Sequence, residues 1–197
     1  MAKPIVARWE WRTFGECGEL EEAEKGIRSY EQKDFKESVE DYILSRKSDE
    51  NTKIRSDLMD IKALQNVNEH KLEQWMPIMK EGFPISQEAL KELFGVFKIT
   101  APAFERTEYT YDQFLNELIR PDENLRVVDV KKKRCIYSIN NCVVEIAETS
   151  FDGVWLKTIC VEHEDPENVY RTVVELGLKA HPNVNYIQAM KKAVGMI

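Results

Sequence analysis

Basic side chains recur near the middle of segments that have the pattern of β-strands. Lys53 and Arg55 lie in one such segment, Lys62 in the next, and Lys132 and Arg134 in a third. Residues two apart share a face, because side chains alternate between the two faces of a strand. Arginine presents a planar fork of donors and lysine a compact charge, so together they suit phosphate oxygens. An exposed sheet face explains any single pair, whereas three such strands favour a clamp for a long polyanion such as a triphosphate.

A second group of candidate residues consists of glutamates in or near predicted strands: Glu10, Glu145, Glu148, Glu162 and Glu164. Glu162 and Glu164 share a strand face about 6.8 Å apart. Hard divalent cations prefer oxygen ligands, and magnesium is typically held by a few carboxylates together with phosphate oxygens. This pair therefore predicts a metal site, with a strand that ends in solvated acids as the alternative.

The longest stretch of strand pattern covers residues 125–165. Asn-Asn at 140–141 and Asp-Gly at 152–153 divide it into three apolar runs. Both pairs tolerate the positive φ angles of tight hairpin turns, so the stretch is predicted to be a three-stranded antiparallel meander. Alternation places Lys132 on the same face as Val128, and burying isolated charge is costly. That face is therefore either open to solvent or binds something charged.

The remaining elements mix strands and helices, which predicts the α+β class with an antiparallel sheet or barrel and helices grouped outside it. Strand patterns cover residues 5–13, 38–46 and 52–64. Helical spacing covers residues 19–30, 68–97, 166–179 and 185–194. Thr110 and Gln113 form a capping-box pattern that opens a helix over residues 111–118. Residues 1–197 are thus predicted to form a single domain with a helical insertion at about residues 68–120.

Composition limits the class of function. The chain has 197 residues, of which 43% are hydrophobic, and a formal net charge of −7. This acidic balance argues against nonspecific nucleic-acid binding, which depends on basic surface. No apolar stretch is long enough to span a membrane and no signal segment begins the chain, so a cytoplasmic protein without a membrane partner is expected. The four cysteines and three histidines lack the spacing of a zinc site, and the cysteines are expected to be reduced.

Taken together, these residues resemble the CYTH family, the triphosphate tunnel group that includes inorganic triphosphatases, thiamine triphosphatases and class IV adenylate cyclases. Lys53-Ile-Arg55 is similar to the R-x-R strand of that family. The segment that ends at Lys62 resembles the strand that carries the family's next lysine, and Lys132-Lys-Arg134 resembles its K-x-R strand. The resemblance spans most of the chain, and the order and spacing of the motifs carry it.

Three further motifs extend the resemblance into the second half of the chain. Glu148 stands where an acidic residue ends the next strand of the family. Glu162-His-Glu164 is similar to the E-x-E pair, and the segment from Asn183 to Tyr186 is similar to the C-terminal tyrosine motif.

The resemblance implies an eight-stranded antiparallel barrel, closed or nearly closed, whose charged interior binds a triphosphate with Mg²⁺ or Mn²⁺. It implies a metal-dependent hydrolase of tripolyphosphate, thiamine triphosphate or a nucleoside triphosphate. The alternatives are a triphosphate-binding protein with weak catalysis and a class IV adenylate cyclase-like enzyme. A homodimer is left open. The implied phosphate-binding residues are Arg12, Lys53, Arg55, Lys62, Lys132 and Arg134. The implied catalytic residues are Glu10, Glu162 and Glu164, and these hold the metal together with Glu148.

One position departs from the family pattern. The first strand of the family reads E-x-E-x-K, whereas this chain has Arg8-Trp-Glu10-Trp-Arg12. Arg8 cannot ligate a metal, and it adds positive charge beside the expected metal site. Arginine also competes for carboxylates by pairing with them, so a low metal affinity is predicted.

Overall fold

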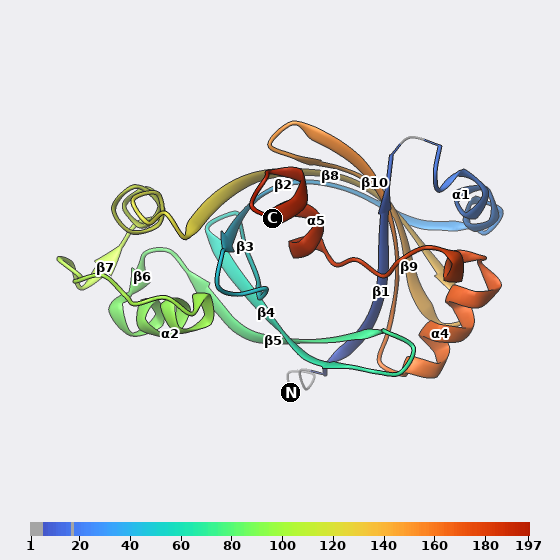
Figure 1. The fold of residues 1–197 in the computed structure, drawn as a ribbon, viewed down its shortest axis with the longest axis horizontal. Coiled ribbons are helices and arrows are strands. Elements are labelled where there is room, and N and C mark those ends of the chain that lie inside the picture. Colours follow the sequence, from blue (N-terminus) through green and yellow to red (C-terminus); the bar gives the residue numbers. More distant parts are fainter. Residues whose placement is uncertain (1–5, 17) are drawn as a thin grey trace.

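Eight antiparallel strands close into a barrel in the computed structural model, which describes residues 6–16 and 18–197 (Figure 1). The strands are β1 (Arg8–Gly15), β2 (Gln32–Ser45), β3 (Asn51–Arg55), β4 (Leu58–Val67), β5 (Glu73–Gly82), β8 (Leu125–Ile139), β9 (Cys142–Phe151) and β10 (Val154–His163). Around the barrel they follow the order β1, β10, β9, β8, β2, β3, β4 and β5, and β5 pairs again with β1. The α+β class and the eight-stranded barrel predicted from the sequence are therefore confirmed.

Helices lie on two flanks of the barrel and at one of its ends (Figure 1). One flank carries α1 (Glu21–Arg28) and α4 (Pro166–Glu175). The other carries β6 (Ile85–Ser86), α2 (Gln87–Phe97), β7 (Glu108–Tyr109), α3 (Tyr111–Gln113) and the π-helix η1 (Phe114–Ile119). After α4 the chain passes through the short helix η2 (Leu178–Ala180) and ends in α5 (Tyr186–Ala193), which lies across one end of the barrel.

Buried apolar residues form three clusters that follow this layout. The first includes Trp11 of β1 and Val169 of α4, on the outer face of the barrel under α1 and α4. The second includes Leu93 and packs α2 and η1 against the outer face of β2, β3 and β4. The third lies inside the barrel, where Val128 of β8 is buried together with Met190 of α5. Apolar side chains thus fill one end of the lumen, and the charged residues occupy the rest.

The predicted meander is confirmed as β8, β9 and β10. Asn140 and Asn141 have φ angles of 52° and 64° in the first turn. Asp152 and Gly153 have φ angles of 50° and 91° in the second. Asparagine, aspartate and glycine accept this left-handed region better than other residues, which is why both turns could be predicted from the sequence.

The helical spacing over residues 68–82 is a wrong prediction, because most of this segment forms strand β5. Trp75 and Met79 recur at helical spacing, but the pairing of β5 with β4 skips Ile78, and this irregularity breaks the two-residue period of the strand. Within the expected insertion at about residues 68–120, the helical part is confined to α2, α3 and η1.

The capping box at the start of α3 is confirmed by both of its hydrogen bonds, between the Thr110 side chain and the Gln113 backbone and between the Gln113 side chain and the Thr110 backbone. The strand predicted over residues 38–46 is longer than expected, since β2 begins at Gln32. This extension runs along β8, where Phe35 pairs with Cys135.

Two residues used in the sequence predictions, Ile5 and Cys17, lie outside the described residues. The other three cysteines are free thiols, as expected. None of the helices in the described part of the chain is long and apolar enough to cross a membrane.

Candidate functional site

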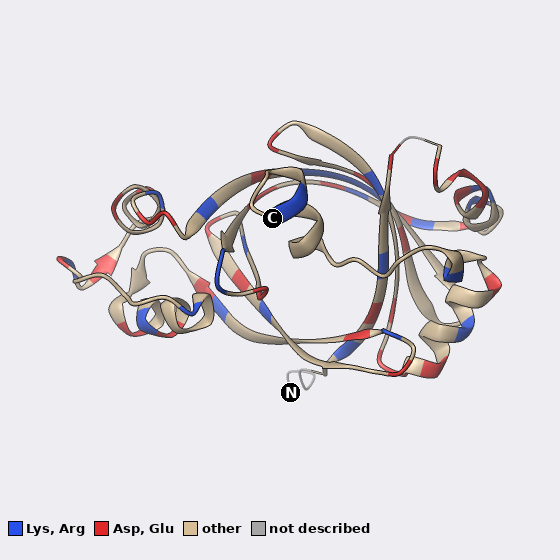
Figure 2. Ribbon diagram, in the orientation of Figure 1, with Lys and Arg blue, Asp and Glu red and all other residues tan. Residues whose placement is uncertain are grey.

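The barrel lumen contains a cavity of about 140 Å³ whose walls are predominantly polar. Basic and acidic residues are interspersed along the strands of the barrel (Figure 2). Residues two apart on the same strand, such as Glu10 and Arg12 or Lys53 and Asn51, reach it together because they share the inward face. The lining residues are Glu10, Arg12, Tyr42, Asn51, Lys53, Asp60, Lys62, Lys132, Arg134, Glu145, Glu162 and Tyr186.

One side of the cavity, formed by β3, β4 and β8, carries three cations that are not in ion pairs with any described residue, together with Asp60, the cross-strand neighbour of Lys53. Lys53, Lys62 and Arg134 line it, and among the described residues none of these three cations has a carboxylate within ion-pair distance. Arg134 donates from Nη2 to Ser38 Oγ at 3.3 Å, and its Nε is buried without a hydrogen-bond partner. Burial lowers the pKa of Lys53, and the charge of Lys62 lowers it further, against an opposing effect of Glu40.

Lys132 lies on the same side but is held by groups of the protein. Its Nζ donates to Glu40 Oε2 at 2.9 Å and to Tyr42 Oη at 2.7 Å. It also lies 4.4 Å from the centre of the Tyr186 ring. Burial lowers the pKa of Lys132 to about 8 in spite of Glu40, and Lys53 contributes to the decrease. Burial acts to raise the pKa of Glu40, yet Lys132 and Lys53 lower it to about 2. Burial thus dominates the pKa of Lys132, whereas the positive charge of its neighbours outweighs burial in the pKa of Glu40.

The opposite side of the lumen, formed by β5, β1 and β10, is acidic. Glu10 on β1 is the cross-strand partner of Glu162 on β10 and of Glu73 on β5, so three carboxylates form a row. Such neighbours have Cβ atoms about 4.5–5.5 Å apart. Burial and then the charge of Glu10 raise the pKa of Glu162. Burial also raises the pKa of Glu73, against hydrogen bonds from Asn185 and Trp75. We call Glu73, Glu10 and Glu162 the acidic row.

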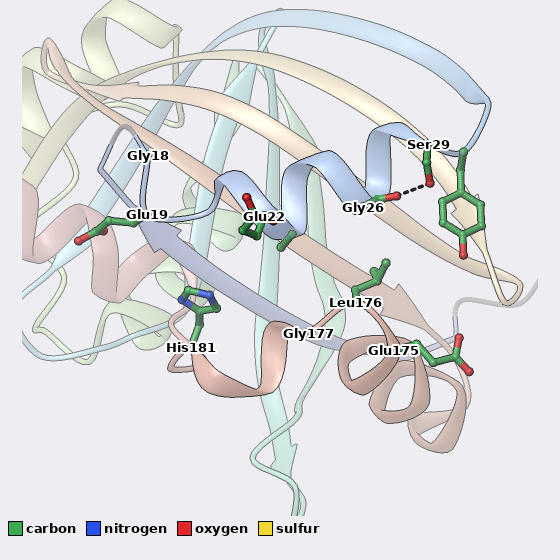
Figure 3. A pocket seen from close by; sticks show the side chains of 11 residues that line it. Gly18, Glu19, Glu22, Gly26, Ser29, Glu175, Leu176, Gly177 and His181 are labelled. Atoms are coloured by element: carbon green, nitrogen blue, oxygen red, sulfur yellow. Dashed lines mark hydrogen bonds between the residues drawn. The ribbon is translucent and has the colours of Figure 1, made fainter.

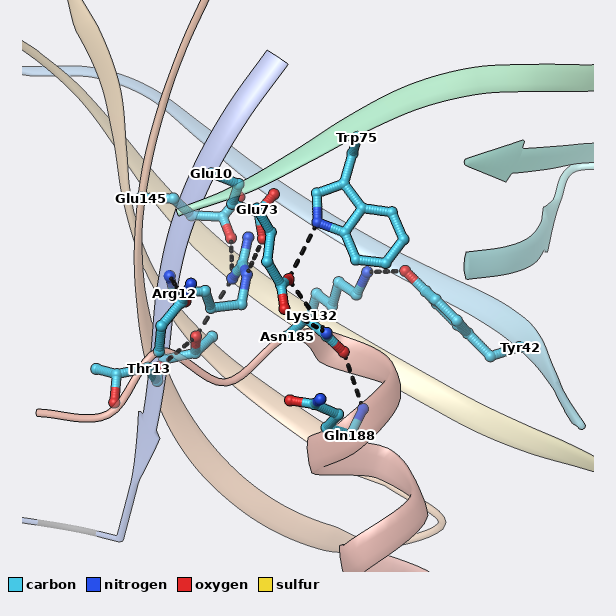
Figure 4. A network of polar contacts seen from close by, with 12 residues as sticks. Glu10, Arg12, Thr13, Tyr42, Glu73, Trp75, Lys132, Glu145, Asn185 and Gln188 are labelled. Carbon is cyan, nitrogen blue, oxygen red and sulfur yellow. Dashed lines mark hydrogen bonds and ion pairs between the residues drawn. The ribbon is translucent and has the colours of Figure 1, made fainter. Parts of the chain in front are cut away.

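Arg12 is bonded to carboxylates on this side (Figure 4). Its Nε donates to Glu10 Oε1 at 2.9 Å, and its Nη1 donates to Glu145 Oε1 and Thr158 Oγ1, both at 3.2 Å. Its guanidinium carbon lies 4.4 Å from the centre of the Tyr186 ring. Burial acts to raise the pKa of Glu10, but Arg12 outweighs it, and the pKa of Glu10 lies below its ordinary value. Two of the Arg12 nitrogens that were expected to bind phosphate, Nε and Nη1, are therefore bonded to carboxylates.

A second arginine meets the acidic row at Glu162 from beyond the cavity lining. Arg8 has 40% of its side chain exposed, and its Nε lies 2.6 Å from Glu162 Oε1 in an ion pair without a hydrogen bond. Magnesium requires oxygen ligands at about 2.0–2.1 Å in near-octahedral geometry. Glu10 and Glu162 offer oxygen donors, as expected for Mg²⁺ or Mn²⁺, but each is paired with an arginine. Within residues 6–16 and 18–197, no three His, Cys, Asp or Glu side chains are arranged to hold a metal ion. The residues present do not fit the expected metal site.

Most of the site residues predicted from the sequence lie together in the lumen cavity: Glu10, Arg12, Lys53, Lys62, Lys132, Arg134 and Glu162. Three predicted residues, Arg55, Glu148 and Glu164, are not among its lining residues.

Glu148 faces the outside of the barrel, where it lines a separate pocket with Arg28 of α1. The hairpin of β8 and β9 pairs Arg134 with Ala147, so the inward positions of β9 are odd-numbered there and include Glu145. Side chains three apart on a strand lie on opposite faces. The prediction that Glu148 joins a metal site in the lumen is therefore corrected, and Glu145 is the carboxylate that β9 contributes. Counting residues outward from the Asn-Asn turn at 140–141 would have identified Glu145 as an inward-facing carboxylate from the sequence.

Glu164 and Arg55 are excluded from the cavity by the ends of their strands. Strand β10 ends at His163, and Glu164 beyond it is exposed. Arg55 is the last residue of β3, with 47% of its side chain exposed, and lies 3.5 Å from Glu40. The predicted Glu162–Glu164 pair is thus reduced to Glu162 at the cavity.

Helix α5 positions an aromatic side chain inside the lumen. Asn185 caps this helix by accepting from the Gln188 backbone at 3.0 Å, and it donates to the two Glu73 oxygens at 3.0 and 3.1 Å (Figure 4). The next residue, Tyr186, stacks on Tyr42 with ring centres 6.2 Å apart. Glu73 and Tyr42 were missed as site residues. Glu73 was missed because its segment was predicted to be helical, and Tyr42 because nothing in the sequence distinguishes it from a core tyrosine.

A larger pocket, of about 550 Å³, lies outside the barrel between α1 and the end of α4 (Figure 3). Glu19, Glu22 and Glu175 contribute carboxylates to its lining. Carboxylates repel an anionic ligand, whereas the lumen carries unpaired cations. The lumen cavity is therefore the candidate site for an anion.

The fold and the cavity define this chain as a closed antiparallel barrel with a charged lumen. No family model matches the sequence, and no curated protein matches it. Solved structures do match. A candidate adenylyl cyclase from Hippeastrum, described as having a dominant triphosphatase activity, aligns at a TM-score of 0.54 and 10% identity over 95% of each chain.

Two further structures give similar values. A conserved hypothetical protein from Pyrococcus furiosus aligns at a TM-score of 0.52 and 16% identity, over 91% of this chain and 98% of that one. A candidate adenylate cyclase from Bacillus halodurans aligns at a TM-score of 0.52 and 15% identity, over 93% and 97%. The likeness at these identities concerns the fold. The chain shares the overall fold of these structures, as its resemblance to the CYTH family implied.

Proposed function

We propose that the lumen binds the triphosphate group of a small molecule and that the protein hydrolyses its terminal phosphoanhydride bond. The observation that carries this proposal is the set of three cations, Lys53, Lys62 and Arg134, that converge from three strands on one cavity without carboxylate partners among the described residues. Unpaired charge in a partly buried cavity is costly unless a ligand of opposite sign occupies it. A polyphosphate supplies that charge along its length.

The size of the cavity restricts which part of the ligand it can enclose. Pockets for drug-sized ligands have volumes of about 300–1,000 Å³. The lumen cavity, at about 140 Å³, is smaller than that range. It suits phosphate groups, and a nucleoside or thiamine attached to them has to lie outside it. This favours tripolyphosphate, or a triphosphate bound by its phosphates alone, over an enzyme that must recognise adenine to cyclise ATP.

In the proposed reaction a water oxygen bonds to the terminal phosphorus. The bond from that phosphorus to the bridging oxygen breaks, and its electron pair leaves on the diphosphate product. The water proton that is lost passes to the products or to solvent. The protein contributes position and fixed charge, because phosphoryl transfer depends mainly on alignment and on stabilisation of negative charge.

A second candidate function, a triphosphate-binding protein without efficient catalysis, is favoured by the ion pairs of the acidic side. Glu10 is paired with Arg12 and Glu162 with Arg8. The arginine beside each carboxylate lowers its basicity, which makes it a weaker general base for a water molecule. Binding depends on the opposite side of the lumen and does not require these ion pairs to open.

Two measurements on the unmodified protein separate these candidates. Calorimetric titration with tripolyphosphate measures binding, and phosphate release from tripolyphosphate, thiamine triphosphate and ATP, with EDTA, Mg²⁺ or Mn²⁺, measures hydrolysis. Binding with phosphate release supports the hydrolase, and binding alone supports the second candidate. Formation of cyclic AMP and diphosphate from ATP would favour a cyclase. If no triphosphate binds under any of these conditions, the assignment of the lumen as a triphosphate site is wrong.

A further inference from the structure

We propose that Arg8 and Arg12 take the place of a divalent metal in the lumen, so that the site binds triphosphate without Mg²⁺ or Mn²⁺. This inference rests on the proposed triphosphate site and concerns its acidic side. In a site that requires a metal, the carboxylates need a cation from solution. Here the chain itself supplies the cations at the same carboxylates.

The contacts of the acidic row show how completely it is occupied. Glu10 Oε1 accepts from Arg12 Nε at 2.9 Å, and Glu162 Oε1 lies 2.6 Å from Arg8 Nε. The two oxygens of Glu73 accept from Asn185 Nδ2, and one of them also accepts from Trp75 Nε1 at 3.2 Å. Glu10 and Glu73 therefore accept hydrogen bonds from the protein, whereas Glu162 is in an ion pair with Arg8, whose Nε makes no hydrogen bond to a described residue.

Charge balance leads to the same conclusion. Two guanidinium groups carry together the charge of one divalent cation, and arginine stays protonated at any pH at which the protein is folded. A metal ion entering the row would be repelled by both arginines and would compete with them for the charge of Glu10 and Glu162. Arg12 is also buried, with 6% of its surface exposed, and is bonded to Glu145 as well as Glu10, so it cannot swing away into solvent without breaking several contacts.

The two sides of the lumen then have separate tasks. Lys53, Lys62 and Arg134 face the ligand, while Arg8 and Arg12 neutralise the carboxylates that would otherwise repel it. A metal-free triphosphate carries its full negative charge, and the unpaired cations match that state of the ligand better than its neutralised metal complex.

Binding of Mn²⁺ itself tests the role of Arg8 independently of activity. The amplitude of the electron paramagnetic resonance signal of free Mn²⁺ decreases when the ion binds. We expect the unmodified protein to leave this signal unchanged. Arg8→Gln frees Glu162 and should increase Mn²⁺ affinity at least about tenfold, the equivalent of one lost competing interaction of about 1.4 kcal/mol. Arg106→Gln is the control, because Arg106 forms an arginine–glutamate pair of similar arginine exposure, at 2.9 Å with Glu117 of η1, and neither residue lines the lumen cavity.

Calorimetric titration of the unmodified protein with tripolyphosphate, once in EDTA and once in excess Mg²⁺, completes the test. The inference predicts binding in EDTA that is at least as tight as binding in Mg²⁺. Binding that requires Mg²⁺, stoichiometric Mn²⁺ binding by the unmodified protein, or an Arg8→Gln variant that gains no Mn²⁺ affinity would each overturn it. Binding of tripolyphosphate that requires Mg²⁺ would overturn this inference but leave the proposed function intact. The proposed function fails only if tripolyphosphate binds neither in EDTA nor in Mg²⁺, so the two failures are distinguishable.

Discussion

Replacing Arg134 and Arg55 separately by methionine compares two arginines that the sequence alone treats as equivalent. Arg134 lines the cavity, and its Nη2 donates a hydrogen bond to Ser38 Oγ. Arg55 lies outside the cavity lining, is 47% exposed, and is close to Glu40 at 3.5 Å. Methionine retains much of the side-chain volume, so the substitutions remove charge with little loss of packing.

The loss of tripolyphosphate affinity should be about 2- to 150-fold greater for Arg134→Met than for Arg55→Met. A hydrogen bond to a charged group contributes about 1.5–3 kcal/mol, which corresponds to a loss of about 10- to 150-fold for Arg134→Met. An exposed charge contributes about 0–1 kcal/mol, so Arg55→Met should lose about fivefold at most. Because Arg134 has no carboxylate partner among the described residues, its removal leaves no buried charge unpaired, and the melting temperature should change little.

Calorimetric titration at an ionic strength of about 0.1 M keeps long-range charge effects screened beyond about 10 Å and so isolates direct contacts. Each variant also needs a thermal melt, to show that it remains folded. Equal losses for the two variants, or a larger loss for Arg55→Met, would refute the assignment of β8 to the ligand-binding wall and of the β3 terminus to its periphery.

Three further predictions concern the charged lumen. Tripolyphosphate affinity should decrease as the pH rises through about 8, because Lys132 loses its proton near its pKa of about 8, and Lys132→Arg should remove that decrease. Calorimetry between pH 6.5 and 9 measures both, and an unchanged pH profile in the variant would show that another group titrates. Glu162→Gln should raise the melting temperature at pH 7 and lose this benefit near pH 4. The pKa of Glu162 is raised in the folded protein, so the protonated side chain favours the folded state below the unfolded pKa. This favourable effect is lost as the pH rises through the folded pKa, and the ionised side chain is then the less stable one to bury. A lower melting temperature at pH 7 would mean that the Arg8 ion pair outweighs burial. Glu145→Gln removes negative charge from the lumen and should tighten tripolyphosphate binding, whereas Glu148→Gln on the outer wall should not, and the reverse order in a titration would restore Glu148 to the site.

The sequence by itself determined which side chains share a strand face. Lys132 and Arg134 lie two apart, as do Lys53 and Asn51, and alternation places each pair on one face of its strand whatever the rest of the fold does. The turn residues at 140–141 and 152–153 specified the hairpins, because few other residues accept positive φ. These local rules, together with the motif resemblance, were enough to predict the barrel and most of the cavity wall.

Strand β5 shows where local rules failed. Its apolar spacing resembled a helix, since the skipped residue Ile78 interrupts the two-residue period, and only the pairing with β4 and β1 makes the segment a strand. With β5 misassigned, Glu73 could not be placed beside Glu10. The acidic row therefore could not be recognised from the sequence.

Which charges meet was decided only by closure of the barrel. Closure puts β1 between β5 and β10, and this brings Arg8 to Glu162 although the two are separated by most of the chain. The energy of an ion pair depends on separation and burial, neither of which a linear pattern specifies. The sequence could supply the cations and carboxylates of a triphosphate site. The tertiary structure alone decided that the carboxylates are matched by arginines and that Lys53, Lys62 and Arg134 are left facing the cavity.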